Sequence, residues 1–163
     1  MADLLNNTNS NANNYGDDAI VTLSPREHIR LRPGMYIRGG GDGSQPDEAL
    51  YVLIKEVVDN SIDEFIMGAG RQIDITLADN VVTVRDYGRG IPLKSLAAAV
   101  GQMNTGGKYG GDAFKKTVGL NGVGVKAVNM LSEEFTARSV RDGEARTVTF
   151  AKGLEVSDRW ESG

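Results

Sequence analysis

Hydrophobic positions recur at helical spacing over residues 46–66, the longest patterned stretch of the chain. Pro46 suits the first turn of this predicted helix, and Gly68 and Gly70 provide its end. The segment EVVDNSIDE (56–64) forms a narrow polar strip on it, although acidic groups among core residues are costly unless they are paired. The residues expected to cover the rest of the helix are apolar: Leu50, Leu53, Ile54, Val57, Val58, Ile62, Phe65 and Ile66.

Shorter patterns predict the remaining elements. Alternation at period two predicts one β-hairpin over 72–86, turning at Asp79-Asn80, and a second hairpin from strands at 134–140 and 145–151. Residues 152–163 show no convincing pattern. Helical patterns predict three shorter helices, within 23–37, 93–103 and 125–131. This order of elements predicts an α+β fold with helices on one face of a mainly antiparallel sheet.

Composition narrows the class of protein. The 163 residues fit one domain, 19–163, after a flexible Asn-rich arm over 1–18. A net charge of −4 argues against a surface that grips nucleic acid, and the absence of cysteine fits a cytoplasmic protein. No apolar run reaches the roughly 18 residues that span a bilayer, so no membrane partner is expected.

The polar strip of the long helix can carry chemistry. Glu56 and Asn60 are four residues apart and share a face, which Asp63 continues one turn later. A carboxylate there can orient water, and an amide oxygen can bind a divalent cation whose other ligands include phosphates. A solvated acidic stripe is the common alternative, and the helix alone leaves both interpretations open.

The segment RDYGRGIP (85–92) offers a hydrogen-bond acceptor at a strand end. Asp86 shares a strand face with Val82 and Val84, while Gly88 and Gly90 leave the backbone beside it open. Such a carboxylate suits the amino group of adenine. The alternative is a turn in which Asp86 accepts a hydrogen bond from its own backbone.

The stretch 104–127 is rich in Gly and Lys and leads into an apolar helix. Gly-rich turns and helix N-termini bind anions, which predicts a phosphate loop, with a flexible linker as the alternative. The P-loop pattern fails at Gln102 and Tyr109, and the G-x-G-x-x-A match at 122–127 lacks a preceding strand. Together with the two preceding signals, the loop indicates a nucleotide pocket.

Five motifs now occur in order: RPGMYI, EVVDNSIDE, DYGRGIP, TGGKY and GLNGVGVKAVN. From about Tyr15 to Gly153, the chain resembles the N-terminal ATPase domain of bacterial type IIA topoisomerase B subunits, as in DNA gyrase and topoisomerase IV. These domains belong to the GHKL ATPases. The resemblance implies a Bergerat fold, with helices on one face of a mixed, mainly antiparallel sheet.

The resemblance implies a role for each matching residue. Glu56 would be the general base that activates water, and Asn60 would bind Mg²⁺ together with the phosphates of ATP. Asp86 would accept the adenine amino group, and Arg89 would pair with Glu64 at the rim of the pocket. The other implied ATP-binding residues are Tyr15, Asp63, Gly90, Ile91, Pro92, Gly106, Gly107, Lys108, Leu120, Asn121, Gly122, Val123 and Gly124.

The resemblance also implies partners. Tyr15 would contact the nucleotide of a second B subunit in an ATP-dependent homodimer, and Arg141 would lie at the pocket mouth, where aminocoumarin inhibitors bind. The A subunit and DNA would be bound by parts outside this chain. The transducer and Toprim domains have no match here, so we expect a truncated fragment that binds ATP with little or no hydrolysis.

Several alternatives stay open. The sequence does not distinguish gyrase from topoisomerase IV, because Tyr87 and Asn121 differ from the residues that many gyrases have at these positions. A MutL-type repair protein shares the Glu/Asn pair. A histidine-kinase catalytic domain typically lacks the glutamate four residues before the asparagine, so Glu56 argues against it. The last alternative, a non-enzymatic module with an acidic helix, would not bind ATP.

Overall fold

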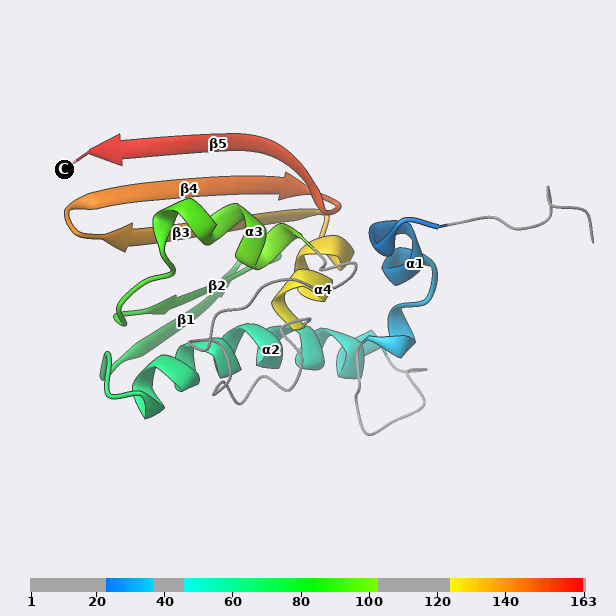
Figure 1. Cartoon of the computed structure of the whole chain (residues 1–163). Helices are drawn as coiled ribbons and strands as arrows, with labels where there is room; N and C mark the ends of the chain where they lie inside the picture. Colours follow the sequence, from blue (N-terminus) through cyan, green and yellow to red (C-terminus); the bar gives the residue numbers. More distant parts are fainter. Residues whose placement is uncertain (1–22, 37–45, 103–123, 163) are drawn as a thin grey trace, which may run out of the picture.

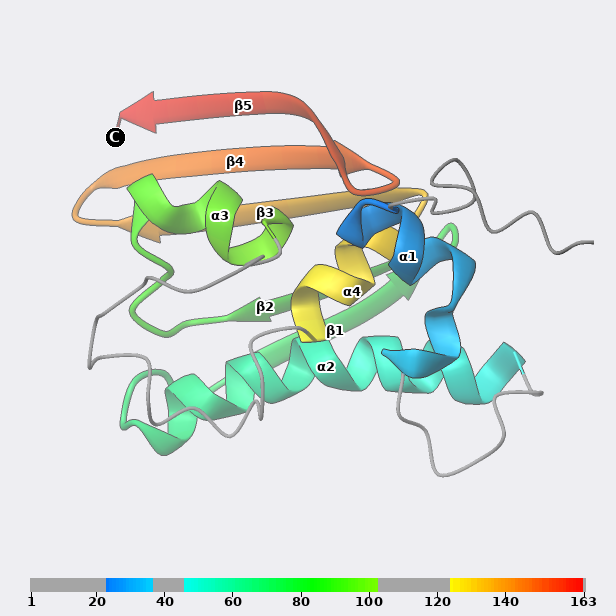
Figure 2. The ribbon, with the colours of Figure 1, turned by 45° about the vertical axis from the view of Figure 1, so that its right-hand side comes forward.

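The computed structural model describes residues 23–36, 46–102 and 124–162 (Figure 1). The helices are α1 (Pro25–Leu31), α2 (Pro46–Ile66), α3 (Leu96–Gly101) and α4 (Gly124–Leu131), with short 3-10 turns η2 (Pro33–Met35) and η3 (Leu93–Ser95). The strands are β1 (Ile73–Ala78), β2 (Val81–Asp86), β3 (Glu134–Arg141), β4 (Glu144–Ala151) and β5 (Leu154–Ser162). Both views show the helices on one face of the strands, which confirms the predicted α+β arrangement (Figures 1 and 2).

Three of the four connections between successive strands are tight turns of one kind. Asp79 and Asn80, between β1 and β2, have φ of 51° and 61°, and the later turns place Asp142 and Lys152 in the same left-handed region, each followed by a glycine. Two-residue turns with positive φ match the twist of antiparallel strands. Both predicted hairpins are therefore confirmed.

The strands form two antiparallel sheets that lie next to each other, β1–β2 and β3–β4–β5. No parallel pairing occurs among the described strands, and β2 and β3 are not hydrogen-bonded to each other. Instead, the chain that leaves β2 contacts the end of β3, where Ser139 Oγ donates to the backbone oxygen of Ile91 at 2.8 Å. This contact brings the residues after Asp86 to the junction of the two sheets.

The sequence shows no convincing pattern over residues 152–163, yet residues 152–162 form regular structure. They supply the Lys152-Gly153 turn and β5, which pairs with β4 along its length. A register irregularity between Thr149 and Phe150 and the exposure of most β5 side chains explain why no alternation is visible in the sequence. An edge strand exposed in this way carries little hydrophobic signal.

Two clusters of buried side chains hold the helices in place. One joins α3 to β4 and contains Leu96, Val100, Val148 and Phe150. The other joins α1 to α4 and contains Ile29, Ala127 and Met130. Two arginines of α1 reinforce the second cluster: Arg26 Nε donates to Lys152 O in the β4–β5 turn, and Arg30 Nη1 donates to Met130 O at 2.7 Å.

The apolar arc of α2 is covered only in part by the described residues. Val52 is 9% exposed, but several residues expected in the core are exposed: Leu50, Ile62, Phe65 and Ile66. The helix packs mainly on α4 and β2, and these four side chains stay 39–63% exposed. Among the residues described here, no helix combines the length and the apolar character needed to cross a bilayer.

Candidate functional site

The polar strip of α2 contains Glu56, which is half-buried, Asn60, which is exposed, and Asp63, which is 8% exposed. Asn60 Nδ2 donates to the backbone oxygen of Glu56 at 2.9 Å, so its Oδ1 is the atom of the amide turned away from the helix backbone. Asp59, by contrast, pairs with Lys55 on the surface. The strip therefore separates into a surface ion pair and a face with a carboxylate and an amide oxygen.

The first residue of α4 lies directly against Glu56. A Cβ atom on Gly124 would stand 1.9 Å from Glu56 Oε2, so a side chain there would displace the carboxylate. Glycine thus lets the N-terminus of α4, the positive end of the helix dipole, approach α2. The structure brings together Glu56 and Gly124, which are 68 positions apart in the sequence. Asn60 follows Glu56 one turn along α2.

The residues present fit a cation shared with a phosphate ligand. No group of three or more His, Cys, Asp or Glu side chains able to hold a metal occurs within residues 23–36, 46–102 and 124–162. Mg²⁺ is usually bound by one or two protein oxygens together with substrate phosphates and water. Asn60 Oδ1 can supply one such oxygen, one helical turn from Glu56, and the helix N-terminus that lies against Glu56 is suited to an anion.

Asp86, at the end of β2, uses both carboxylate oxygens. Oδ1 accepts from the backbone N–H of Gly88 at 2.9 Å, and Oδ2 accepts from Ser61 Oγ at 3.4 Å. The turn interpretation is therefore correct for one oxygen, while the other faces α2. Ser61, which is 6% exposed, was not among the residues predicted from the sequence. Its position in the sequence, directly after Asn60 and among apolar residues, could have indicated that it is buried next to the site.

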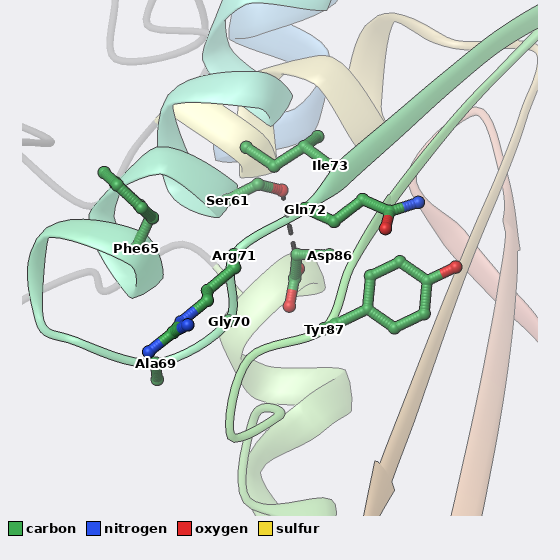
Figure 3. A pocket seen from close by; sticks show the side chains of 9 residues that line it. All are labelled: Ser61, Phe65, Ala69, Gly70, Arg71, Gln72, Ile73, Asp86 and Tyr87. Carbon is green, nitrogen blue, oxygen red and sulfur yellow. Dashed lines mark hydrogen bonds between the residues drawn. The ribbon is translucent and has the colours of Figure 1, made fainter.

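A hollow of about 270 Å³ opens between the end of α2 and the β1–β2 hairpin (Figure 3). Figure 3 shows Ser61 and Asp86 joined by their hydrogen bond within it. Its lining residues are Ser61, Phe65, Ala69, Gly70, Arg71, Gln72, Ile73, Asp86 and Tyr87. Of the predicted site residues only Asp86 lines it, so this hollow borders the site of Glu56 and Asn60 without containing it.

The residues after β2, 88–93, are called the rim segment here. Glu64 of α2 holds its beginning: Arg89 donates to Glu64 through its backbone N–H (3.1 Å), its Nε (3.1 Å) and its Nη2 (2.8 Å). The Arg89 hydrogen bond lowers the pKa of Glu64, with a smaller contribution from the charge of Arg141. A Cβ on Gly88 would lie 2.9 Å from Glu64 Oε2. The predicted brace is confirmed.

The middle of the rim segment lies against the end of β3. Gly90 has φ +74°, and a Cβ there would stand 2.7 Å from the backbone oxygen of Val140, so two features require glycine. Arg141 Nη1 makes a long contact of 3.5 Å with the backbone oxygen of Gly90. Arg141 therefore lies beside the rim segment, which contains the predicted residues Ile91 and Pro92.

Arg146 of β4, which was not among the residues predicted from the sequence, holds the end of the rim segment. Its Nη1 donates to Leu93 O at 2.6 Å, and its Nε and Nη2 donate to Asp158 of β5 at 2.9 and 2.7 Å. The Arg146 guanidinium lies 4.9 Å from the centre of the Trp160 ring.

Eight predicted residues lie outside the described residues: Tyr15, Gly106, Gly107, Lys108, Leu120, Asn121, Gly122 and Val123.

The chain is similar to known ATPases in sequence. Residues 45–155 match the family described as histidine kinase-, DNA gyrase B-, and HSP90-like ATPase. The chain is 55% identical over 146 residues to the B subunit of DNA topoisomerase 4 from Borreliella burgdorferi, covering 90% of this chain and 24% of that protein. It is 40% identical over 151 residues to the corresponding protein of Streptococcus pneumoniae, covering 88% and 23%.

A solved structure shows the same fold. The chain matches the 43K ATPase domain of Thermus thermophilus gyrase B in complex with an aminocoumarin, with a TM-score of 0.65, 28% identity, and coverage of 84% of this chain and 34% of that one. The chain spans about a quarter of the length of the curated relatives it matches. Since the family match covers most of the chain and the structural match agrees with it, the chain belongs to the histidine kinase-, DNA gyrase B- and HSP90-like ATPases.

Proposed function

We propose that the chain is the ATP-binding domain of the B subunit of a type II DNA topoisomerase, which couples an ATP-driven dimer clamp to DNA strand passage. The observation that carries the proposal is the approach of the α4 N-terminus to Glu56, with Asn60 one turn further along α2. The 55% and 40% identities to topoisomerase IV proteins favour topoisomerase IV over gyrase.

Each end of the nucleotide has candidate contacts. Asp86 would accept the adenine amino group, and Ser61 and the Gly88 N–H hold its carboxylate in place. The phosphates would lie at the N-terminus of α4, where backbone N–H groups and the helix dipole favour anions. Asn60 would hold Mg²⁺, which when bound neutralises phosphate charge.

Glu56 would perform the central step of hydrolysis. Its carboxylate would orient a water in line with the γ-phosphorus and accept its proton as the new P–O bond forms and the bond to ADP breaks. Lys108, outside the described residues, would stabilise the charge on the transferred group.

Substitution of Glu56 tests the assignment. Glu56→Gln in the complete B subunit should reduce the rate of ATP hydrolysis by about 10²- to 10⁴-fold. Nucleotide affinity should stay within about threefold, because the amide keeps the shape of the side chain. Glu48→Gln, on the exposed first turn of the same helix, is the matched control. Unchanged hydrolysis in Glu56→Gln would exclude Glu56 as the base, and no ATP binding by the unaltered chain would favour a non-enzymatic module.

The partners follow from the same proposal. A second B subunit would pair with the first when ATP binds, with Tyr15 reaching the partner's nucleotide, and the A subunit and DNA would be engaged by the rest of the longer protein. An aminocoumarin would compete with ATP at Asp86 and Arg141, as the ligand of the gyrase B structure suggests. A topoisomerase of bacterial DNA acts in the cytoplasm, and we propose that location.

A further inference from the structure

Asn129 of α4 is a fully buried polar side chain, 0% exposed. Its Nδ2 donates to the backbone oxygen of Val100 at 2.9 Å, but its Oδ1 is buried and has no hydrogen-bond partner in the part of the chain that the structure describes. A buried amide with a half-used hydrogen-bonding capacity is unfavourable compared with an apolar side chain of the same size. Core packing alone therefore does not account for an asparagine here.

The partner of Asn129 lies at the end of α3. Val100 belongs to the last turn of that helix, whose carbonyl groups have no partner within the helix. The same turn is fixed from its other side, because a Cβ on Gly101 would lie 2.6 Å from Cε1 of the Phe150 ring. Asn129 thus ties α4 to a helix end that has no room to move toward β4.

The other end of α4 has equally little freedom. Gly124 precedes Asn129 by five residues, about 7.5 Å along the helix axis. There, the space beside Gly124 is occupied by Glu56 Oε2. A shift of α4 toward α2 would displace the carboxylate, and a shift away would withdraw the helix N-terminus. The hydrogen bond from Asn129 to Val100, being directional, sets the position and rotation of α4 between α3 and α2.

We infer that Asn129 is a positioning residue for the nucleotide reaction: by holding α4 on α3, it keeps the α4 N-terminus and the Glu56 carboxylate at the spacing that ATP requires. The inference rests on the proposed function. The competing role is a purely structural cap for α3. Loss of such a cap would change the melting temperature. It would not change the affinity of the folded protein for ATP, and its effect on hydrolysis would not depend on whether Glu56 is present.

The first experiment measures ATP affinity and melting temperature of the chain and three variants. Asn129→Leu and Asn129→Asp, which keep the side-chain size but remove the amide N–H donor, should each weaken ATP binding about tenfold at a temperature where circular dichroism shows them folded. Ser132→Ala also removes a hydrogen bond within the α4 end, from Ser132 Oγ to Val128 O, and should bind as the unaltered chain does. Unchanged affinity in both Asn129 variants would overturn the inference.

The second experiment measures hydrolysis in the complete B subunit. Asn129→Leu should reduce kcat about tenfold, but should cause no further loss when Glu56 is already glutamine, because it acts through that carboxylate. Equal loss in both backgrounds would overturn the inference. If neither Leu nor Asp is folded, Asn129→Ser, which introduces neither bulk nor charge, replaces them. If the unaltered chain bound no ATP, the proposed function itself would be refuted. If the unaltered chain bound ATP and the Asn129 variants bound it equally well, only the role of Asn129 would be refuted.

Discussion

Two arginine–carboxylate pairs hold the two ends of the rim segment, and they differ in exposure. Arg89 with Glu64 holds its beginning, with side chains 53% and 26% exposed. Arg146 with Asp158 holds its end, with side chains 11% and 30% exposed, and Arg146 also donates to the rim segment backbone. Each pair is joined by two side-chain hydrogen bonds from the guanidinium.

The exposure of the arginine side chain decides whether each pair contributes mainly to stability or mainly to local geometry. Water can replace the partners of an exposed guanidinium, so such pairs add little stability and act mainly by fixing a local geometry. A buried guanidinium that loses its partners, or a buried carbonyl that loses its donor, has no such replacement. We therefore expect the Arg146 pair to determine the stability of the domain, and the Arg89 pair to determine the shape of the nucleotide site.

The largest effect is expected from Arg146→Met. Removing the guanidinium leaves Leu93 O and Asp158 without their donor and should lower the free energy of unfolding by about 3 kcal/mol. Urea denaturation followed by circular dichroism measures it. Arg138→Met, which breaks the exposed pair with Glu161, should change the same quantity by less than about 0.5 kcal/mol. Equal losses in the two variants would contradict the distinction by burial.

The second-largest effect is expected from Arg89→Met, which should change the affinity for ATP more than the stability of the fold. Without its contacts to Glu64 the rim segment samples other conformations, so the dissociation constant for ATP should rise about tenfold. The melting temperature should fall less than in Arg146→Met. Calorimetric titration measures the affinity, and Arg85→Met, whose guanidinium lies over the Tyr87 ring, is the matched control. A large loss of stability with unchanged affinity would reverse the assigned roles.

Acid should weaken both pairs. Hydrogen bonds from Arg89 lower the pKa of Glu64 from its usual 4.5, and hydrogen bonds from Arg146 lower the pKa of Asp158 from its usual 3.8. Because both pKa values are depressed on folding, the stabilisation is present above the ordinary values and is lost as the pH falls through the folded ones. The free energy of unfolding should therefore decline below about pH 4.5, and less steeply in Arg146→Met. A variant slope equal to that of the unaltered chain would exclude Asp158 as a contributor.

The smallest effect is expected from Trp160→Leu. The indole lies on the Arg146 guanidinium but is 51% exposed, so its loss should lower the free energy of unfolding by about 0.5–1 kcal/mol. Thermal unfolding by circular dichroism measures the change. A loss as large as that of Arg146→Met would show that stacking, rather than the ion pair, holds the end of the rim segment.

Much of the fold was predictable, because local rules decide it. Pro46 and Gly68 bound α2 as expected, and Asp79-Asn80 forms the first hairpin turn. The pairing of Arg146 with Asp158 was not predictable, since it depends on β5 and on a register with an irregularity that no alternation reveals. Whether an apolar residue such as Phe65 is buried also depends on which elements reach it, and periodicity contains no such information.

The site divides in the same way. Glu56, Asn60 and Asp86 were singled out because carboxylates and amides in apolar surroundings are unusual, and the pairing of Arg89 with Glu64 was predicted as a structural brace. Ser61 and Asn129 were not found, because a single Ser or Asn in a helix is common and only the packing shows that it is buried. Their roles depend on contacts across 25 and 29 positions of the sequence.

The contacts of α1 have a consequence for synthesis. Arg26 and Arg30 bind backbone oxygens 126 and 100 positions later in the chain, and Ile29 packs on residues of α4. At about 5–20 residues per second, α1 would leave the ribosome roughly 5–25 s before these partners exist. During that interval Ile29 has no core to enter. Among the described helices, α1 would be made first but would be among the last to dock, and chaperones that bind exposed apolar segments would have their best opportunity there.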